Sequence, residues 1–239
     1  MRLGVLLPTF REGGDDALDF SDQAADARID GVFAYDHLWP MGTPTRPSLA
    51  PFALLSVIAR RHENLVVGPL VARIGLVGTR HLLEQFLTLD ALAPGRVICA
   101  LGTGDKLSAP ENLAYGLSAQ TSDERRAMMR ETASALEARM PVWIGAGAPA
   151  TNDLARELGV TLNLWDASPE TVSKMSAEGP VTWAGPVPED LAGTLSALES
   201  AGAAWTVLSP QVDIGQLVAW RDTRTTAAAT TSSFRGPDQ

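Results

Sequence analysis

The sequence contains one cysteine among its 239 residues. Cys99 therefore cannot form an internal disulfide, and its place in an apolar run predicts a buried, unreactive thiol. The histidines, the cysteine and the acidic residues also show no spacing typical of metal ligands. The sequence thus predicts neither a disulfide framework nor a metal site.

Clustered positive charge and long apolar runs are absent as well. The formal net charge is −9 and no cluster of lysine and arginine stands out, so nucleic acid is not an expected partner. No apolar run approaches the roughly 20 residues that a membrane span requires. The apolar N-terminus ends at Pro8 and indicates a first strand rather than a signal peptide. We expect a soluble, cytoplasmic protein without membrane contact.

Three motifs of common enzyme classes are missing. The sequence has no G-x-S-x-G nucleophile elbow. It has no lysine that would complete a P-loop after its glycine-rich segments, and no G-x-G-x-x-G after the first predicted strand. These absences argue against serine hydrolysis, nucleoside triphosphate chemistry and a dinucleotide-binding open sheet.

What the sequence does contain is a regular alternation of short β-prone runs and longer helical segments. We expect strands over residues 3–8, 31–35, 65–71, 96–101, 141–145, 161–165, 181–184 and 205–208. We expect helices over residues 15–28, 47–61, 79–92, 121–139, 149–158, 168–177, 188–201 and 213–221, and a loop over 106–120. This alternation predicts an α/β fold, a (β/α)8 TIM barrel, with a doubly wound open sheet as the structural alternative. One domain over residues 1–222 and a low-complexity, disordered tail over 223–239 are expected.

Polar residues follow several of the predicted strands. In a barrel the C-terminal ends of all strands lie on one face, where the chemistry of such folds takes place. Asp36 and His37 end the second strand, and a carboxylate beside an imidazole can give a proton donor or acceptor near neutral pH. An isolated Asp-His pair is more often a capping acid beside an exposed histidine, but this position at the active face favours chemistry.

Two glycine-rich segments follow the fourth and fifth predicted strands. One is Gly102-Thr103-Gly104-Asp105, and the other runs from Gly145 through Gly147 into the start of a helix. Glycine lets backbone N–H groups approach an anion closely, and a helix N-terminus favours phosphate. Each segment alone could be an ordinary tight turn, whereas the two together favour a phosphate-bearing cofactor.

Three segments, in this order, resemble the luciferase-like monooxygenase superfamily. They are Asp36-His37-Leu38-Trp39, then Thr88-Leu89-Asp90-Ala91-Leu92-Ala93-Pro94-Gly95-Arg96 leading into Gly102-Thr103-Gly104-Asp105, then Pro141-Val142-Trp143-Ile144-Gly145-Ala146-Gly147. The resemblance covers most of residues 1 to about 210. It is closest to the branch that uses the deazaflavin coenzyme F420. It implies a (β/α)8 barrel and hydride transfer between ring carbon C5 of F420 and a small organic substrate.

The same resemblance assigns site residues. It makes His37 the catalytic histidine, which exchanges a proton with the substrate. It makes Asp105 a catalytic acid, standing where F420-dependent glucose-6-phosphate dehydrogenases have a glutamate that is one methylene longer. A nonprolyl cis peptide, common in the family, would fall at Leu70-Val71. The coenzyme-contacting positions that the resemblance implies are Asp36, Leu70, Val71, Arg73, Thr103, Gly104, Ser108, Gly147, Ala148, Ala150 and Thr151.

Two other functions stay open at this point. An FMN-dependent luciferase-like monooxygenase would share the same motifs. A non-catalytic barrel, binding a flavin-like ligand or only a partner, is the second alternative, because the chain lacks most of the insertions that shape the substrate pocket in longer relatives. The family's sugar-phosphate-binding residues have no counterparts here, so a sugar phosphate is not the expected substrate. A homodimer is expected by analogy alone.

Overall fold

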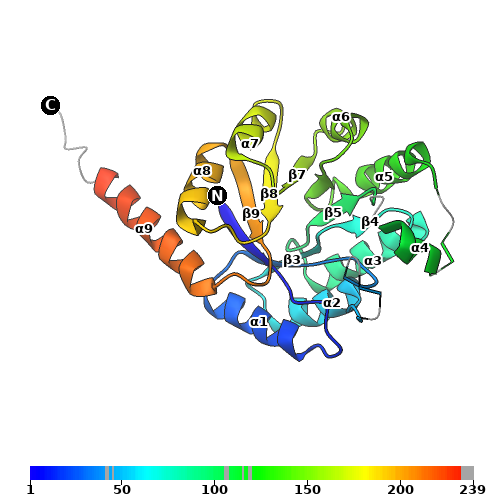
Figure 1. Ribbon diagram of the computed structural model, residues 1–239, viewed down its shortest axis with the longest axis horizontal. Coiled ribbons are helices and arrows are strands. Elements are labelled where there is room, and N and C mark those ends of the chain that lie inside the picture. Colours follow the sequence, from blue (N-terminus) through cyan, green and yellow to red (C-terminus); the bar gives the residue numbers. More distant parts are fainter. Residues whose placement is uncertain (41–42, 45, 105–107, 115, 118–119, 233–239) are drawn as a thin grey trace.

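The computed structural model describes residues 1–40, 43–44, 46–104, 108–114, 116–117 and 120–232, with side chains through Arg224. Its strands are β1 (Arg2–Leu6), β2 (Gly31–Ala34), β3 (Val66–Pro69), β4 (Ala72–Arg73), β5 (Cys99–Gly102), β6 (Val142–Gly145), β7 (Thr161–Trp165), β8 (Val181–Gly185) and β9 (Ala203–Leu208). Its helices are α1 (Asp15–Asp26), α2 (Pro51–Arg61), α3 (Thr79–Leu92), α4 (Ala109–Ala114), α5 (Ser122–Leu136), α6 (Pro149–Glu157), α7 (Pro169–Ser176), α8 (Leu191–Ser200) and α9 (Ile214–Ser232). Strands and helices alternate along most of the chain, as the sequence predicts (Figure 1).

The strands form one parallel sheet that closes into a barrel. Their hydrogen-bonded order is β3-β2-β1-β9-β8-β7-β6-β5-β4. β3 also pairs with the segment leading into β5, because the Val67 N–H donates to the Arg96 carbonyl (2.8 Å) and the Ile98 N–H donates to the Val67 carbonyl (3.0 Å). β3 lies within the strand predicted over residues 65–71, and β4 follows directly after it. The two short strands together occupy one position of the ring, which therefore has eight strand positions. The predicted TIM barrel is confirmed.

The break between β3 and β4 lies at Leu70-Val71, where the peptide bond is cis. This is the position that the family resemblance implies. Pro69, just before the break, has no N–H to donate to a neighbouring strand, which suits an interruption of the strand at this point. The Leu70 N–H still donates to the Ala34 carbonyl at 2.8 Å, so the chain stays attached to β2 up to the break.

Aromatic side chains fill the barrel interior. Phe33, Trp143 and Trp205 come from β2, β6 and β9 and are buried. The Trp143 ring stacks on Phe33 with 5.5 Å between centroids and meets Trp205 at 5.7 Å. A second apolar layer, which includes Cys99, packs the helices onto the outside of the barrel, and burial raises the pKa of the Cys99 thiol. The interior is thus a packed core, and in barrels of this kind the active site lies at the carboxyl rim.

Several element boundaries differ from the sequence-based expectation. The helix expected from residue 47 begins at Pro51, and the strand expected from residue 96 begins at Cys99. Residues 109–114, inside the predicted loop, form the short helix α4. The helix expected from Pro188 begins at Leu191, because the Asp190 side chain accepts a hydrogen bond from the Gly193 N–H (2.9 Å) and caps the helix there. A further difference concerns the end of the chain.

The last helix is longer than expected. The sequence predicts an end near Arg221 and a disordered tail over 223–239, whereas α9 continues to Ser232. Three successive alanines at 227–229 favour a helical backbone here. Figure 1 shows α9 running away from the barrel on one side. Residues 233–239 lie outside the described part. Among the helices of the described chain, none is long and apolar enough to cross a membrane.

Candidate active site

The end of β2 is linked to the end of β4 through Asp36. The Asp36 carboxylate accepts a hydrogen bond from the backbone N–H of Arg73 at 2.9 Å. Burial raises the pKa of Asp36, whereas this N–H and the charges of Arg73 and His37 oppose the rise. The net direction is upward, so the Asp36 carboxylate sits where solvation of a negative charge is poor.

A buried carboxylate, Glu111 of α4, faces this pair of strand ends. Its side chain is 1% exposed. One oxygen lies 2.9 Å from His37 Nδ1, and the other accepts a hydrogen bond from the Leu38 N–H at 3.2 Å and lies 3.0 Å from Arg73 Nη2. A carboxylate at this depth requires such donors and cations. Glu111 therefore orients the His37 ring and compensates the Arg73 charge.

Arg73 is buried and only partly hydrogen-bonded. Its side chain is 6% exposed, and Nη1 donates to the Asn112 side-chain oxygen at 3.4 Å. Nη2 is close enough to Glu111 for an ion pair but not oriented for a hydrogen bond. Among the described residues, neither Nε nor Nη2 has a hydrogen-bond partner. Buried N–H groups without partners are costly, so these two mark a place where a polar ligand group would be stabilised.

Val71 lies against the ends of β5 and β6 and explains the glycine at the end of β5. A Cβ added at Gly102 would lie 2.3 Å from Val71 Cγ2, and one added at Gly145 would lie 3.6 Å from Val71 Cγ1. The first distance is a severe clash, whereas the second is ordinary contact. The Val71 side chain thus lies across these two strand ends, at the same rim as Asp36 and Arg73.

The loop between β6 and α6 leads directly into a helix N-terminus. Ala148 is the N-cap residue and Pro149 is the first helical residue. The Gly147 N–H donates to the Asn152 side-chain oxygen at 3.0 Å, which fixes the loop. Thr151 is buried, whereas Ala148 and Ala150 are exposed. Pro149 has no N–H, and the Thr151 N–H already donates to the Ala148 carbonyl at 2.8 Å. The Ala150 N–H is therefore the amide of the first turn that is open to an anion at the rim.

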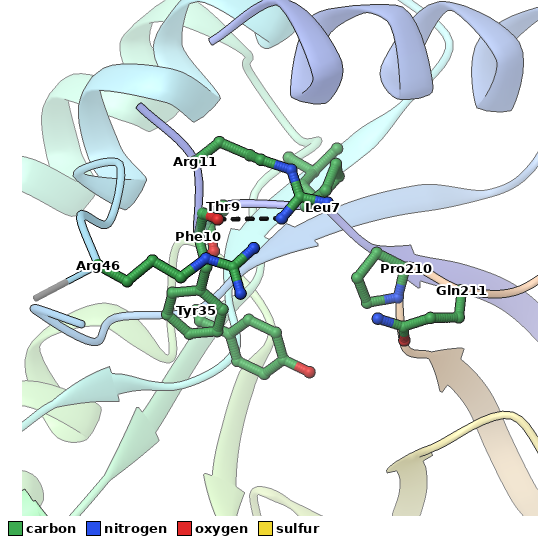
Figure 2. Close-up of a pocket in the computed structure, with 9 residues that line it drawn as sticks. Leu7, Thr9, Phe10, Arg11, Tyr35, Arg46, Pro210 and Gln211 are labelled. Carbon is green, nitrogen blue, oxygen red and sulfur yellow. Dashed lines mark hydrogen bonds between the residues drawn. The ribbon is translucent and has the colours of Figure 1, made fainter. Parts of the chain in front are cut away.

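Aromatic rings extend the rim towards β1 and β7. Phe10 stacks on Tyr35 with 5.4 Å between centroids. The Tyr35 ring lies 6.5 Å from the His37 ring and 6.4 Å from that of Trp165. Trp165, at the end of β7, is 53% exposed. Beside Phe10 and Tyr35 opens a cavity of about 280 Å³ (Figure 2).

The structure brings some of the predicted site residues into contact and leaves others apart. Asp36, His37 and Arg73 belong to one cluster: Glu111 contacts both His37 and Arg73, and Asp36 accepts a hydrogen bond from the Arg73 backbone N–H. The remaining predicted positions lie at the same rim: Leu70 and Val71 between β3 and β4, Thr103, Gly104 and Ser108 after β5, and Gly147, Ala148, Ala150 and Thr151 around the start of α6. Asp105 lies outside the described residues.

Glu111 and Asn112 were missed from the sequence, because their segment reads as a loop. A usable signal was present: Ser108-Ala109-Pro110-Glu111 has the S-x-x-E spacing that precedes many helices. No group of three histidine, cysteine or acidic side chains in the described chain is arranged to hold a metal ion.

Comparisons with known proteins place this barrel in a family. Residues 1–139, more than half of the chain, match the family model described as luciferase-like monooxygenase. An F420-dependent glucose-6-phosphate dehydrogenase of Microbacterium testaceum is 25% identical over 185 residues, and one of Beutenbergia cavernae is 31% identical over 147 residues. The alignments cover 65% and 61% of this chain and 54% and 42% of the relatives. The chain thus spans about half the length of the curated relatives it matches.

Solved structures share the fold. An F420-dependent secondary alcohol dehydrogenase in complex with an F420-acetone adduct has a TM-score of 0.74 at 14% identity, covering 92% of this chain and 97% of that chain. The coenzyme F420 dependent tetrahydromethanopterin reductase from Methanopyrus kandleri has a TM-score of 0.70 at 11% identity, covering 92% and 96%. These likenesses agree with the family match, and the chain therefore belongs to the luciferase-like monooxygenase family.

Proposed function

We propose that the protein is an oxidoreductase that transfers a hydride between coenzyme F420 and a small organic substrate. The observation that carries this proposal is the cluster of Asp36 and His37, both partly buried, with the buried Arg73 and Glu111 at the carboxyl rim of the barrel. The choice of coenzyme is supported by the names of the curated relatives, which are F420-dependent dehydrogenases.

The residues of the rim fit an anionic, phosphate-bearing coenzyme. The buried Nε and Nη2 atoms of Arg73 offer N–H groups to a polar ring edge. A Cβ added at Gly147 would meet nothing within 4 Å, so space is open at the N-terminus of α6, where the Ala150 N–H and the helix dipole would hold the phosphate. We propose the remaining contacts at Asp36, Leu70, Val71, Thr103, Gly104, Ser108, Ala148, Ala150 and Thr151.

His37 supplies the proton chemistry in this proposal. When bound, F420 supplies or accepts a hydride at ring carbon C5. Glu111 accepts the Nδ1–H of neutral His37. Nε2 is then free to act as the base that takes the proton released while the substrate is oxidised. In the opposite direction Nε2–H returns the proton. Glu111 is a positioning residue because it acts through His37. Asp105 stays a proposed catalytic acid on the family resemblance alone.

The first test is a titration of the purified protein with F420 and, separately, with FMN. We expect F420 to bind at micromolar concentration and at least tenfold more tightly than FMN, because the curated relatives are F420-dependent. Tighter binding of FMN would favour the alternative of an FMN-dependent monooxygenase. Binding of neither would contradict both enzyme functions and favour the non-catalytic barrel.

The second test uses the histidines. Once a substrate is found by the loss of the visible absorbance of F420, His37→Gln should lower turnover by about 10²-fold or more, the usual contribution of general acid–base catalysis. F420 affinity should be retained. His81→Gln, an exposed residue of α3, is the matched control and should leave turnover unchanged. Equal turnover of the His37 variant and the wild type would remove His37 from the mechanism.

The positioning role of Glu111 has its own measurement. In the wild type, nitrogen NMR at a pH where the His37 ring is neutral should show its proton on Nδ1. Glu111→Ala should populate the other tautomer, because the acceptor 2.9 Å from Nδ1 is gone. An unchanged tautomer would show that Glu111 serves stability alone.

We propose, by analogy with the family, a homodimer, and we propose a cytoplasmic location without a nucleic-acid partner. The net charge of −9 supports the last point, because it repels a phosphate backbone. Sedimentation at micromolar concentration checks the homodimer, and a monomer would contradict it.

A further inference from the structure

The cavity of about 280 Å³ opens where β1 runs out of the barrel. Its wall combines two arginines, Arg11 and Arg46, with the stacked rings of Phe10 and Tyr35 and the side chain of Thr9. Figure 2 shows the Arg46 guanidinium next to the ring pair and that of Arg11 beside Leu7, with Pro210 and Gln211 across from them. None of the described side chains that line it is acidic, although the chain as a whole is strongly acidic.

The two arginines differ in how far they are already neutralised. Arg11 Nε pairs with Asp16 at 2.9 Å, and Arg11 Nη1 donates to the Phe10 carbonyl at 3.0 Å. Arg46 has no ion pair with any described residue, and its side chain is exposed. Arg46 is therefore the cation of this cavity that lacks a counter-ion within the described chain.

Thr9 gives a second, independent sign of a ligand. It is 0% exposed, lines the cavity, and its Oγ1 has no hydrogen-bond partner among the described residues. A buried hydroxyl left unpaired costs free energy, so native proteins normally give it a partner. A ligand oxygen in the cavity would be such a partner.

The neighbouring ring stays neutral over the whole useful pH range. Burial raises the pKa of Tyr35 to about 12, so its phenol brings no negative charge to the cavity. The Phe10–Tyr35 pair offers an apolar surface on which a flat group can pack.

We infer that this cavity binds the substrate, and that the substrate is a small molecule with a planar apolar part and a carboxylate. Arg46 is the counter-ion of the carboxylate, Thr9 Oγ1 is a hydrogen-bond partner, and the planar part lies against Phe10 and Tyr35. The inference rests on the proposed function, since the Tyr35 ring lies 6.5 Å from that of the proposed base His37. A planar guanidinium suits a carboxylate, and one unpaired arginine matches one negative charge.

The test uses benzoate as the charged probe and benzamide as its neutral counterpart, in calorimetric titrations without coenzyme. We expect benzoate to bind the wild type at least tenfold more tightly than benzamide. Arg46→Gln should abolish this preference while leaving benzamide affinity unchanged. The matched control is Arg80→Gln, which removes the same charge from an 85% exposed side chain of α3 and should change neither affinity. Equal benzoate affinity in Arg46→Gln and the wild type would overturn the inference, as would undetectable benzoate binding.

Thr9→Val separates ligand binding from folding, since valine has nearly the same shape without the hydroxyl. The variant should bind benzoate several-fold more weakly, yet unfold at a urea concentration no lower than the wild type, because an unpaired hydroxyl has been removed. Unchanged benzoate affinity would overturn the part assigned to Thr9. Inorganic phosphate that displaced benzoate with equal affinity would overturn the choice of a carboxylate.

The outcome is separable from that of the coenzyme titration. Arg46→Gln should bind F420 like the wild type, because Arg46 is not among the proposed coenzyme contacts. Failure of F420 to bind, with the benzoate preference intact, would contradict the proposed function and leave a carboxylate-binding cavity. Normal F420 binding without the benzoate preference would contradict only the inference.

Discussion

One carboxylate holds two basic side chains that come from different strands. Glu111 contacts the imidazole of His37, after β2, and the guanidinium of Arg73, in β4. Removing one partner of a buried ion pair leaves the other charge uncompensated. The same group thus determines both the orientation of the proposed base and the cost of burying Arg73.

Asp36 should make stability depend on pH. Its pKa is raised above the unfolded value of 3.8, mainly by burial, so between the two pKa values the native state holds a proton that the unfolded state has lost. Stability therefore falls as pH rises from about 4 through the native pKa of Asp36. Asp36→Asn keeps an acceptor for the Arg73 N–H and removes this dependence. Urea midpoints of the variant should fall less than those of the wild type between about pH 4 and pH 7.

The control for this series is Asp26→Asn, in which an exposed carboxylate of α1 is lost. Its urea midpoints should follow the wild type across the same pH range. Parallel curves for Asp36→Asn and the wild type would show that Asp36 titrates alike in the folded and unfolded chains.

For individual residues, the sequence predicted which side chains lie at the rim but not which other side chains they contact. Asp36 and His37 follow a recognisable strand, so their place could be read directly. Glu111 is 74 positions from His37, and their contact depends on how the segment after β5 folds back. The local sequence pattern carries no information about a contact between residues so far apart along the chain, which is why Glu111 was missed.

Short helices and helix starts were the elements hardest to predict. α4 spans only Ala109–Ala114, too short for an apolar periodicity to appear. α8 shows the effect of a single cap, because Pro188 and Glu189 look like a helix start while the Asp190 side chain sets the actual one. α1 and α3 carried clear signals in the sequence, and their bounds agree closely with expectation.

The cap of α8 can be tested directly. Asp190→Ala removes the acceptor of the Gly193 N–H and should lower the free energy of unfolding by about 1 kcal/mol. Asp190→Asn, which can still accept this hydrogen bond, should retain most of the stability. Glu189→Ala is the matched control, because it removes an exposed acid next to the cap. Equal losses in the Ala variants at 189 and 190 would show a charge effect rather than a cap.

The whole molecule is a closed barrel of strands surrounded by helices. This fold could be predicted because eight alternating strand–helix pairs are compatible with few other folds. What the sequence did not show is how the interior is filled. Phe33, Trp143 and Trp205 stand far apart along the chain, yet they form one aromatic cluster inside the barrel. Distant parts of the chain therefore stabilise one another through side chains as well as through the sheet.

Truncating this cluster should destabilise the whole barrel at once. Trp143→Ala, at a side chain 3% exposed, should lower the free energy of unfolding by about 3–5 kcal/mol. Circular dichroism and tryptophan fluorescence should still report one shared transition. Trp165→Ala, at a half-exposed ring, is the matched control and should cost less than about 1 kcal/mol. Separate transitions by the two probes would show that the barrel unfolds in parts.

The close approach of Val71 to Gly102 implies that the residue tolerated at one of these positions depends on the residue at the other. With Cγ2 of Val71 only 2.3 Å from a Cβ at position 102, Gly102→Ala alone should be strongly destabilising. Val71→Ala withdraws the clashing methyl and should act as a second-site suppressor, although the Val71 Cβ at 3.3 Å makes the rescue partial. In a double-mutant cycle the two changes should cost less together than the sum of their separate costs. Homologous sequences with a larger residue at position 102 should therefore carry a smaller one at position 71.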